Sequence, residues 1–358
     1  YQTINIDPDK TSQSFYFNWS LDSLLLEDSD QIEYYLEVRD NDGINGRKSS
    51  QTGLYYFRIP DKKERDEDLK KSSQSAENQI DKSLEMAKEL NDKIEEVENR
   101  LKGKKQMNWQ DQKLLDEMIR DKDKLDEEIY KLQELNQANN MKLEKFNELD
   151  AELIKKVDQL QKLMDDLLDE ETKKLFEELK KLLEEKKDLS EVKSLLERID
   201  FKQDNFEKEL ERTLELFKRM KFEVELEKAI EEMDELQKKQ EGLSKETDDR
   251  KNDLEQIKDD QESLNEDFED TRESLEELID INQDLAFPKP MQITKEQEEE
   301  ISKHQKDAME QLENNKRKNA SKSQQNASDQ MRELSESMKQ MQTSGNMEMM
   351  MENYNSLR

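Results

Sequence analysis

Apolar residues recur every three or four positions from about Asp66 onward, which is the spacing of helices that bury one face. The first clear run consists of Ala87, Leu90, Ile94, Val97 and Leu101. It stops at 102–106, where Gly103 and several cations suit a helix C-terminus, and Asn108 is placed to cap a following helix. The pattern predicts two antiparallel helices joined by a turn near 102–108.

The second helix carries the strongest pattern in the chain. Alternate steps of four and three residues from Met118 to Leu167 meet 11 apolar residues in 15 core positions, and a repeat of that length is specific for coiled-coil packing. The polar exceptions are Lys122, Asn136, Asn139 and Asp150. We interpret them as register control or local loosening, because buried polar residues fix register at a cost in stability. Successive core positions near the end of this repeat are Leu153, Val157 and Leu160.

A continuous helix from Asn108 to about Asp188 would extend about 120 Å at 1.5 Å per residue. A further segment follows at 189–197, and residues 200–242 carry most of the helical Phe residues. Bulky side chains at helical spacing predict a helix that meets more than one neighbour, so the bundle should be thickest there. Another long helix is expected over 244–285. The predicted helical domain is 61–287, with breaks near 102–108, 188–200 and 242.

Beyond a proline-containing loop at 288–293, the chain changes character. Thr294 with Gln297 three residues later matches a capping box that opens a Met- and Ala-rich helix over 294–342. We expect a frayed tail at 343–358. On the apolar side of this helix, Met331, Leu334 and Met338 are candidate partner-binding residues, because Met-rich surfaces adapt to varied partners. The alternative is that the same side chains fill a thin core.

Residues 1–60 have a different pattern. They contain 10 of the 21 aromatic residues, and runs at 15–19, 32–38 and 54–59 show the aromatic and β-branched enrichment of strands. Short strands separated by Asp, Asn, Gly and Ser turns are typical of the C-terminal half of an Ig-like β domain. Half a sandwich cannot close its core, so the missing strands would lie upstream of Tyr1 or this piece would pair with another edge.

The predicted fold class is therefore mostly α: a long antiparallel coiled-coil or helical-bundle rod preceded by a partial, Ig-like β-sandwich. Composition agrees, since 42% of residues are charged and only 31% are hydrophobic, which disfavours a single large globular core. Intrinsic disorder is the competing interpretation of these numbers. The sustained heptad order argues against it.

Charge narrows the range of partners. A net charge of −32 disfavours nucleic acid and anionic lipid surfaces, both of which attract cationic segments. No apolar run approaches the length of a membrane-spanning helix, so we expect no direct membrane contact from this chain. It begins with Tyr1 rather than Met, which suggests a piece cut from a longer protein. Protein partners are the remaining expectation, with the oligomeric state unspecified.

Signatures of catalysis are lacking. The sequence has no phosphate loop, no dinucleotide fingerprint and no HExxH or GxSxG motif, and it contains no cysteine. His304 is the only histidine, without partners for a metal or general-base role. The turn at 40–46 lacks key ligands of a calcium loop and is interpreted as an ordinary hairpin turn. We expect a protein that is not an enzyme and has no catalytic residues, metal site or cofactor.

Five segments carry a resemblance to a known family. They are DQIEYYLEVRDNDG at 30–43, NGRKS at 45–49, ERTLELFK at 211–218, QKKQEGL at 237–243 and ASKSQQNA at 320–327. The chain resembles a family of large bacterial membrane-anchored proteins of unknown function, in which an Ig-like domain leads into a long coiled-coil region. The resemblance implies transmembrane helices upstream, more helix downstream, and a periplasmic location in the cell envelope, anchored to the inner membrane.

The leading hypothesis for function is a non-enzymatic cell-envelope scaffold or spacer that presents a coiled-coil rod for protein–protein interaction. The alternative is a holdase-like or secretion-associated component that binds exported proteins through its helical arms. A third hypothesis, an enzyme whose active site lies in portions beyond this chain, stays open. Exposed apolar surface and binding of unfolded clients would distinguish a clamp from a spacer.

Overall fold

The computed structural model describes residues 3–4, 7, 14, 16–21, 24, 26, 29–40, 44, 46–146, 151–168, 170–185, 188–291 and 293–356. The chain divides into two compact units, Tyr1–Lys71 and Ser72–Arg358. The protein is mostly helical, with a small strand region in the first unit.

The described strands of the first unit form two small antiparallel sheets of two strands each. They are β1 Gln31–Tyr34, β2 Glu37–Arg39, β3 Ser49–Gln51 and β4 Tyr55–Arg58. β1 pairs with β4 and β2 pairs with β3. Two residues, 35–36, separate β1 from β2, whereas three residues, 52–54, separate β3 from β4. Trp19 packs edge-on against Tyr34, with ring centroids 5.6 Å apart.

The Ig-like interpretation stays a prediction. The described residues of the expected strand at 15–19 have no strand conformation, and the hairpin turn expected at 40–46 lies largely outside the described residues. After β4, helix α1 (Lys62–Leu101) begins with a reciprocal cap. The backbone N–H of Glu64 donates to Asp61 (2.8 Å) and that of Asp61 donates to Glu64 (3.1 Å).

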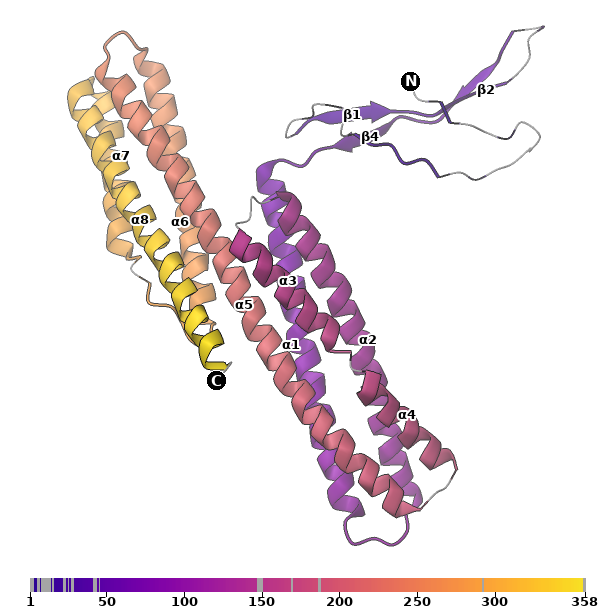
Figure 1. Cartoon of the computed structure of the whole chain (residues 1–358). Helices are drawn as coiled ribbons and strands as arrows, with labels where there is room; N and C mark the ends of the chain where they lie inside the picture. Colours follow the sequence, from indigo (N-terminus) through magenta and orange to yellow (C-terminus); the bar gives the residue numbers. More distant parts are fainter. Residues whose placement is uncertain are drawn as a thin grey trace. The chain divides into compact units, whose positions relative to one another are not determined.

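The second unit contains two helical bundles that share one helix (Figure 1). The first bundle consists of α1 from Ser72 onward, α2 Trp109–Phe146, α3 Ala151–Asp166, α4 Glu170–Glu184 and the N-terminal half of α5 Leu189–Asp248. The α1–α2 hairpin is confirmed. Gly103 takes a positive φ of 80° after α1. Asn108 caps α2 by accepting from the N–H of Asp111 at 2.9 Å.

The single helix predicted over 108–188 is wrong, because the chain reverses between α2 and α3. Gln133 donates to the carbonyl of Met164 (2.9 Å), and Asn136 donates to Gln161 (2.7 Å). Later residues of α2 thus meet earlier residues of α3, which is an antiparallel arrangement. The heptad repeat keeps the same spacing in α2 and α3. It shows which residues of a helix face the core, but it does not show the direction in which the next helix runs. The reversal occurs without glycine or proline, so no sequence signal marked it.

Side chains at the predicted core positions are nevertheless buried. They include Met118, Leu125, Ile129, Leu132, Leu143, Leu153, Val157, Leu160, Met164 and Leu167. The polar exceptions connect helices: Asn136 bonds to α3, and Asn139 accepts from Ser73 of α1 at 3.1 Å. The ammonium of Lys122 pairs with Asp126 and lies near two aromatic rings of α4 and α5. Asp150 lies outside the described residues.

The break predicted near 188–200 falls at the start of that range, between α4 and the N-cap Asp188 of α5. Helix α5 then runs without interruption for 60 residues, so the break predicted near Gly242 is wrong. A single interior glycine costs about 1 kcal/mol, and burial of flanking side chains such as Leu236 and Leu243 outweighs this. The helix begins at its N-cap Asp188 and ends at Asp249. Between residues 214 and 230 no α5 residue is exposed. The helix is surrounded there, as its Phe-rich sequence predicts.

The second bundle consists of the C-terminal half of α5 with α6 Leu254–Gln283, α7 Lys295–Glu313 and α8 Arg317–Ser356. The capping box at Thr294 and Gln297 is present as predicted. The one helix expected over 294–342 is two, because the chain reverses at 314–316, where Asn315 takes a φ of 56°. Helix α8 continues to Ser356, through most of the segment where a frayed tail is expected.

Candidate functional site

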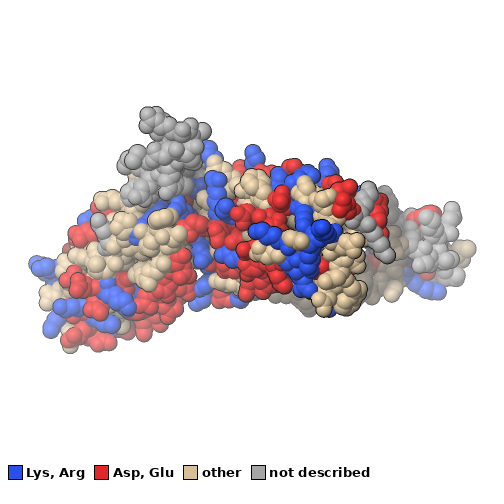
Figure 2. Space-filling model, turned by 90° about the horizontal axis from the view of Figure 1, so that it is seen from below, with Lys and Arg blue, Asp and Glu red and all other residues tan. Residues whose placement is uncertain are grey.

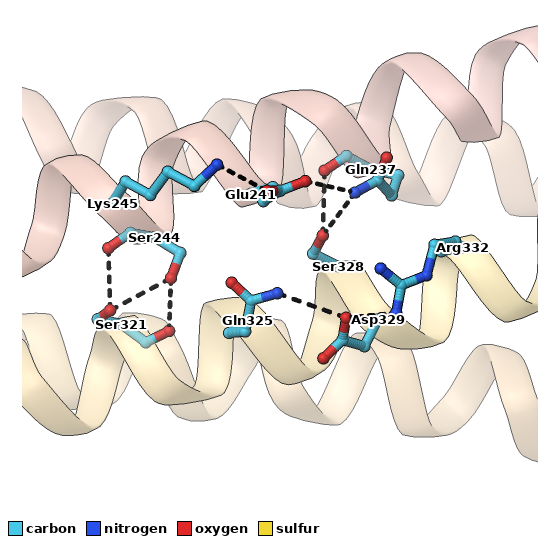
Figure 3. Close-up of polar contacts among 9 residues, drawn as sticks. All are labelled: Gln237, Glu241, Ser244, Lys245, Ser321, Gln325, Ser328, Asp329 and Arg332. Carbon is cyan, nitrogen blue, oxygen red and sulfur yellow. Dashed lines mark hydrogen bonds and ion pairs between the residues drawn. The ribbon is translucent and has the colours of Figure 1, made fainter.

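The face of α8 that packs into the second bundle, mainly against α5 and α7, contains the candidate partner-binding residues. Its buried side chains are mostly small or polar, with Met and Leu toward the C-terminal end. They are Ala320, Ser323, Gln324, Ala327, Ser328, Met331, Leu334, Ser335, Met338 and Met341. Small residues allow two helix backbones to approach closely, and Figure 3 shows the two ribbons side by side with their polar side chains between them. We call this face of α8 and the α5 residues it contacts the α5–α8 interface.

Two pairs of residues hold the α5–α8 interface in register. Ser244 donates to the carbonyl of Ser321 (2.8 Å), and Ser321 donates to the carbonyl of Ser244 (2.9 Å). Gln237 donates to the hydroxyl of Ser328 (3.0 Å), which donates to the carbonyl of Gln237 (3.2 Å). The second pair lies seven residues earlier on α5 and seven later on α8. The spacing is that of one heptad in an antiparallel pair.

Ionic contacts line the edges of this interface. On α5, Lys245 and Gln237 donate to Glu241, and these bonds hold the pKa of Glu241 below its usual value. Farther along, Ser335 (2.5 Å) and Lys339 (2.7 Å) of α8 donate to Asp234 of α5. Burial raises the pKa of Asp234, but the hydrogen bonds from Lys339 and Ser335 outweigh it and the net pKa is lowered.

Between the two helices, Gln325 of α8 donates to Asp329 at 3.4 Å and Arg332 donates to the same carboxylate at 2.9 Å (Figure 3). Both contacts join residues of the same helix. They stabilise α8 itself, and the charge of Arg332 also helps to lower the pKa of Glu241 on α5.

A layer of four glutamines crosses the core of the second bundle. Each helix contributes one, and all four are nearly or fully buried: Gln240 of α5, Gln261 of α6, Gln305 of α7 and Gln324 of α8. Gln240 donates to Gln261 at 2.9 Å, and Gln324 donates to the same oxygen at 2.9 Å. Gln305 donates to Gln240 at 3.3 Å. Shifting one helix by a turn would separate these partners, so the layer selects one register for the bundle.

Met331, Leu334 and Met338 lie in the apolar core next to this layer, and each is 0% exposed. The structure therefore corrects the view of these residues as an accessible binding face. The alternative weighed from the sequence, packing onto the neighbouring helices, describes their environment. Sequence reasoning recognised their apolar spacing but missed the glutamine layer. Its signal was a Gln at a core position in each of four helices, which can be recognised only once the pairing is known.

Polar side chains also gather elsewhere on the surface formed by the described residues. Among them no group of His, Asp and Glu side chains could hold a metal ion. A shallow open depression is lined by Arg272, Glu299, Ser302, Lys303, Lys306 and Asp307. Arg272 there is engaged by Glu269 (2.7 Å) and by the buried Glu298 (3.4 Å). Burial raises the pKa of Glu298 more than its contact with Arg272 lowers it.

No protein-family model, curated protein or solved structure matches the chain. The resemblance to membrane-anchored envelope proteins therefore rests on the quoted segments alone. Within the described part of the chain, no helix is both long enough and apolar enough to cross a membrane.

Proposed function

We propose that this chain is a non-enzymatic scaffold or spacer that holds protein partners apart along a helical support. The observation that carries the proposal is the shared helix α5. A 60-residue helix extends about 90 Å at 1.5 Å per residue. Its two halves are each stiffened by a different set of helices, and no residue between 214 and 230 is exposed. A continuous helix supported on all sides at its midpoint resists bending there.

Contacts at this midpoint support the same proposal. Glu223 of α5 pairs with Lys156 of α3, in the first bundle, and with Lys289 of the α6–α7 loop, in the second. Lys289 also lies 5.4 Å from the centroid of the Phe222 ring. One α5 side chain thus contacts both bundles. All three charged side chains are at most 16% exposed, so salt screens these pairs less than surface pairs.

The surface suits interaction with proteins rather than with polyanions. The chain has a net charge of −32, and Figure 2 shows acidic side chains spread over the displayed face with Lys and Arg among them. Such a surface repels nucleic acid and anionic lipid. The proposed location, the periplasmic side of the bacterial envelope, follows from the sequence resemblance.

Distance measurements on α5 test the spacer proposal. Because the chain has no cysteine, Asn205→Cys with Glu246→Cys places one spin label in each bundle, both at exposed positions. A straight helix puts them about 60 Å apart. Glu231→Cys with Glu246→Cys, both within the second bundle, is the matched control. A single narrow distance distribution for each pair would support the spacer proposal. A broad distribution for the long pair alone would show a hinge at the midpoint and contradict it.

A second candidate function, the holdase-like module, is favoured by one observation in the first unit. Tyr34, Tyr55, Tyr56 and Phe57 on β1 and β4 are 36–57% exposed, and chaperone-type binding requires accessible apolar surface. Suppression of aggregation of an unfolded client protein tests this candidate. Activity that is lost when Tyr56 and Phe57 are both replaced by Ser would support it. If a tenfold excess of the chain does not suppress aggregation of the client, the holdase-like function is contradicted and the spacer proposal remains.

A further inference from the structure

Helix α8 is connected to α7 by a turn that the local sequence does not demand. The turn comprises residues 314–316, and Asn315 adopts the left-handed conformation at φ 56°. L-residues disfavour this conformation, although Asn tolerates it better than most. Residues 295–344 contain neither glycine nor proline, and their apolar spacing predicts one continuous helix. The reversal therefore combines a weak local signal, an Asn in place of the usual Gly at the left-handed position, with packing of α8 in the bundle.

Straightening the turn would disrupt little of the core. Residues 313–316 are all exposed. The turn forms backbone hydrogen bonds from Asn315 to Leu312 (3.0 Å) and from Lys316 to Gln311 (2.7 Å), and the side chain of Asn314 donates to the carbonyl of Glu310 (2.8 Å). A continuous helix would replace them with bonds of its own. The elements on either side would keep their helical backbone.

Contacts of α8 could re-form unchanged on an identical bundle. The reciprocal Ser244–Ser321 pair and the Gln237–Ser328 pair both join α8 to α5. Arg317, at the start of α8, donates to the carbonyl oxygens of Asp249 (3.1 Å) and Asn252 (2.7 Å) in the α5–α6 turn. All these α8 groups would move together. A second copy offers the same acceptors in the same register.

We propose that α8 is exchanged between two copies of this chain. In the exchanged dimer the 314–316 turn becomes helical and joins α7 to α8. Each α8 then occupies the groove between α5 and α7 of the other copy. Because α8 starts at the bundle end that carries the α5–α6 turn, the two second bundles would meet at those ends. The glutamine layer restores the register, since Gln324 must again reach Gln261 of its new bundle. The surface that forms between the two chains is the α5–α8 interface, and the partner is a second copy of this chain.

An engineered disulfide distinguishes the two states. The chain has no cysteine, and the hydroxyl oxygens of Ser244 and Ser321 are 3.2 Å apart, close enough for a Ser244→Cys, Ser321→Cys disulfide. The double variant is concentrated or refolded at high protein concentration, oxidised, and run under denaturing, non-reducing conditions. An unexchanged chain gives a monomer with an internal bond. An exchanged pair gives a covalent dimer. Ser321→Cys alone controls for random cross-linking.

Two variants of the 314–316 turn are expected to shift the dimer dissociation constant in opposite directions. Replacing Asn314 and Asn315 together with Ala favours the continuous helix, and we expect the dimer dissociation constant to fall at least tenfold. Asn315→Gly favours the turn, and we expect the dimer dissociation constant of this variant to rise several-fold. Light scattering measures the oligomer, and the disulfide reports its connectivity.

The proposal is overturned if the double Ala variant stays monomeric with an internal disulfide at all concentrations, or if it dimerises while the disulfide stays within one chain. Failure of α8 exchange leaves the spacer proposal intact, because that rests on distances within α5 of a single chain.

Discussion

Gly103 and Gly242 have opposite backbone environments, and this predicts opposite effects for the same substitution. Gly242 lies inside α5 with no neighbour near an added Cβ, whereas Gly103 has a φ of 80°. We expect Gly242→Ala to raise the free energy of unfolding by about 0.5–1 kcal/mol. Gly103→Ala should lower it by about 1–2 kcal/mol, because an L-residue is strained there. Denaturant midpoints of the two variants measure both effects, and a loss of stability in Gly242→Ala would contradict the open space beside it.

Glu128 predicts how the first bundle responds to acid. Lys131, Lys82 and Gln79 donate to its carboxylate and lower its pKa to about 2 from 4.5. The folded pKa lies below the unfolded one, so the stabilisation is present above about pH 4.5 and is lost as the pH falls toward 2.

We expect Glu128→Gln to cost about 1 kcal/mol at pH 7, since such partly exposed pairs contribute little, and to reduce the loss of stability between pH 5 and pH 3. Glu127→Gln, at the neighbouring exposed position, is the control. Urea titrations at several pH values give the slopes. Equal slopes in the wild type and in Glu128→Gln would show that Glu128 is not the group responsible.

At the scale of elements, α3 has a buried and an exposed side that can be tested separately. Leu160 is 2% exposed and Ile154 is 42% exposed. We expect Leu160→Asp to destabilise the first bundle by about 3–5 kcal/mol, because an unpaired charge enters an apolar layer. Ile154→Asp should change stability by less than about 0.5 kcal/mol. Melting curves followed by circular dichroism compare them, and similar melting temperatures would mean that the core side of α3 is assigned incorrectly.

Helix α8 offers the corresponding test in the second bundle. Replacing Met331, Leu334 and Met338 together with Gln removes three fully buried apolar side chains, each worth about 1.5–3 kcal/mol. We expect the second bundle to unfold or to melt at much lower temperature. Glu333→Gln with Glu336→Gln, on the exposed side of the same helix, should leave the melting curve unchanged. An unchanged melting curve for the triple variant would restore the earlier view of an accessible binding face.

The elements also show what the sequence could predict. Helical periodicity predicted the buried faces, and short capping motifs placed the starts of α2 and α7, because both depend on neighbours within a few residues. The reversals between α2 and α3 and at 314–316 were not predicted. They depend mainly on which helices pack together, and neither place contains a glycine or proline; the one local signal at 314–316 is Asn315, which can end a helix in the left-handed conformation. Gly242 shows the opposite error, since a helix-weakening residue was taken for a break although tertiary packing outweighs it.

The glutamine layer was missed for a related reason. Gln240, Gln261, Gln305 and Gln324 are far apart in sequence, and each alone is an ordinary polar residue in a polar helix. Only the pairing of α5 with α6, α7 and α8 brings them to one level. Met331, Leu334 and Met338 were found by their spacing, but spacing alone cannot tell whether an apolar face meets the same chain or another protein.

At the scale of the whole second unit, α5 should couple the two bundles, because the same helix supplies part of each core. Phe217 and Phe222 are 0% exposed near its midpoint, and Phe222 belongs to the core of the second bundle. Local opening of either bundle would therefore remove packing from the other. We expect the most protected amides of α2 and of α6 to exchange with similar free energies, through one cooperative opening.

Breaking α5 at its midpoint tests this coupling. Glu225→Pro removes a helical hydrogen bond and introduces a clash, at a cost of about 3 kcal/mol, without truncating any core side chain. We expect the amides of α2 and α6 to separate into two groups with different exchange free energies, and the thermal transition to split. Glu225→Ala keeps a strong helix former at the same position and should preserve the single transition. Two transitions already present in the wild type would mean that α5 joins the bundles without transmitting stability between them, and a spacer built on it would be stiff only while both bundles stay folded.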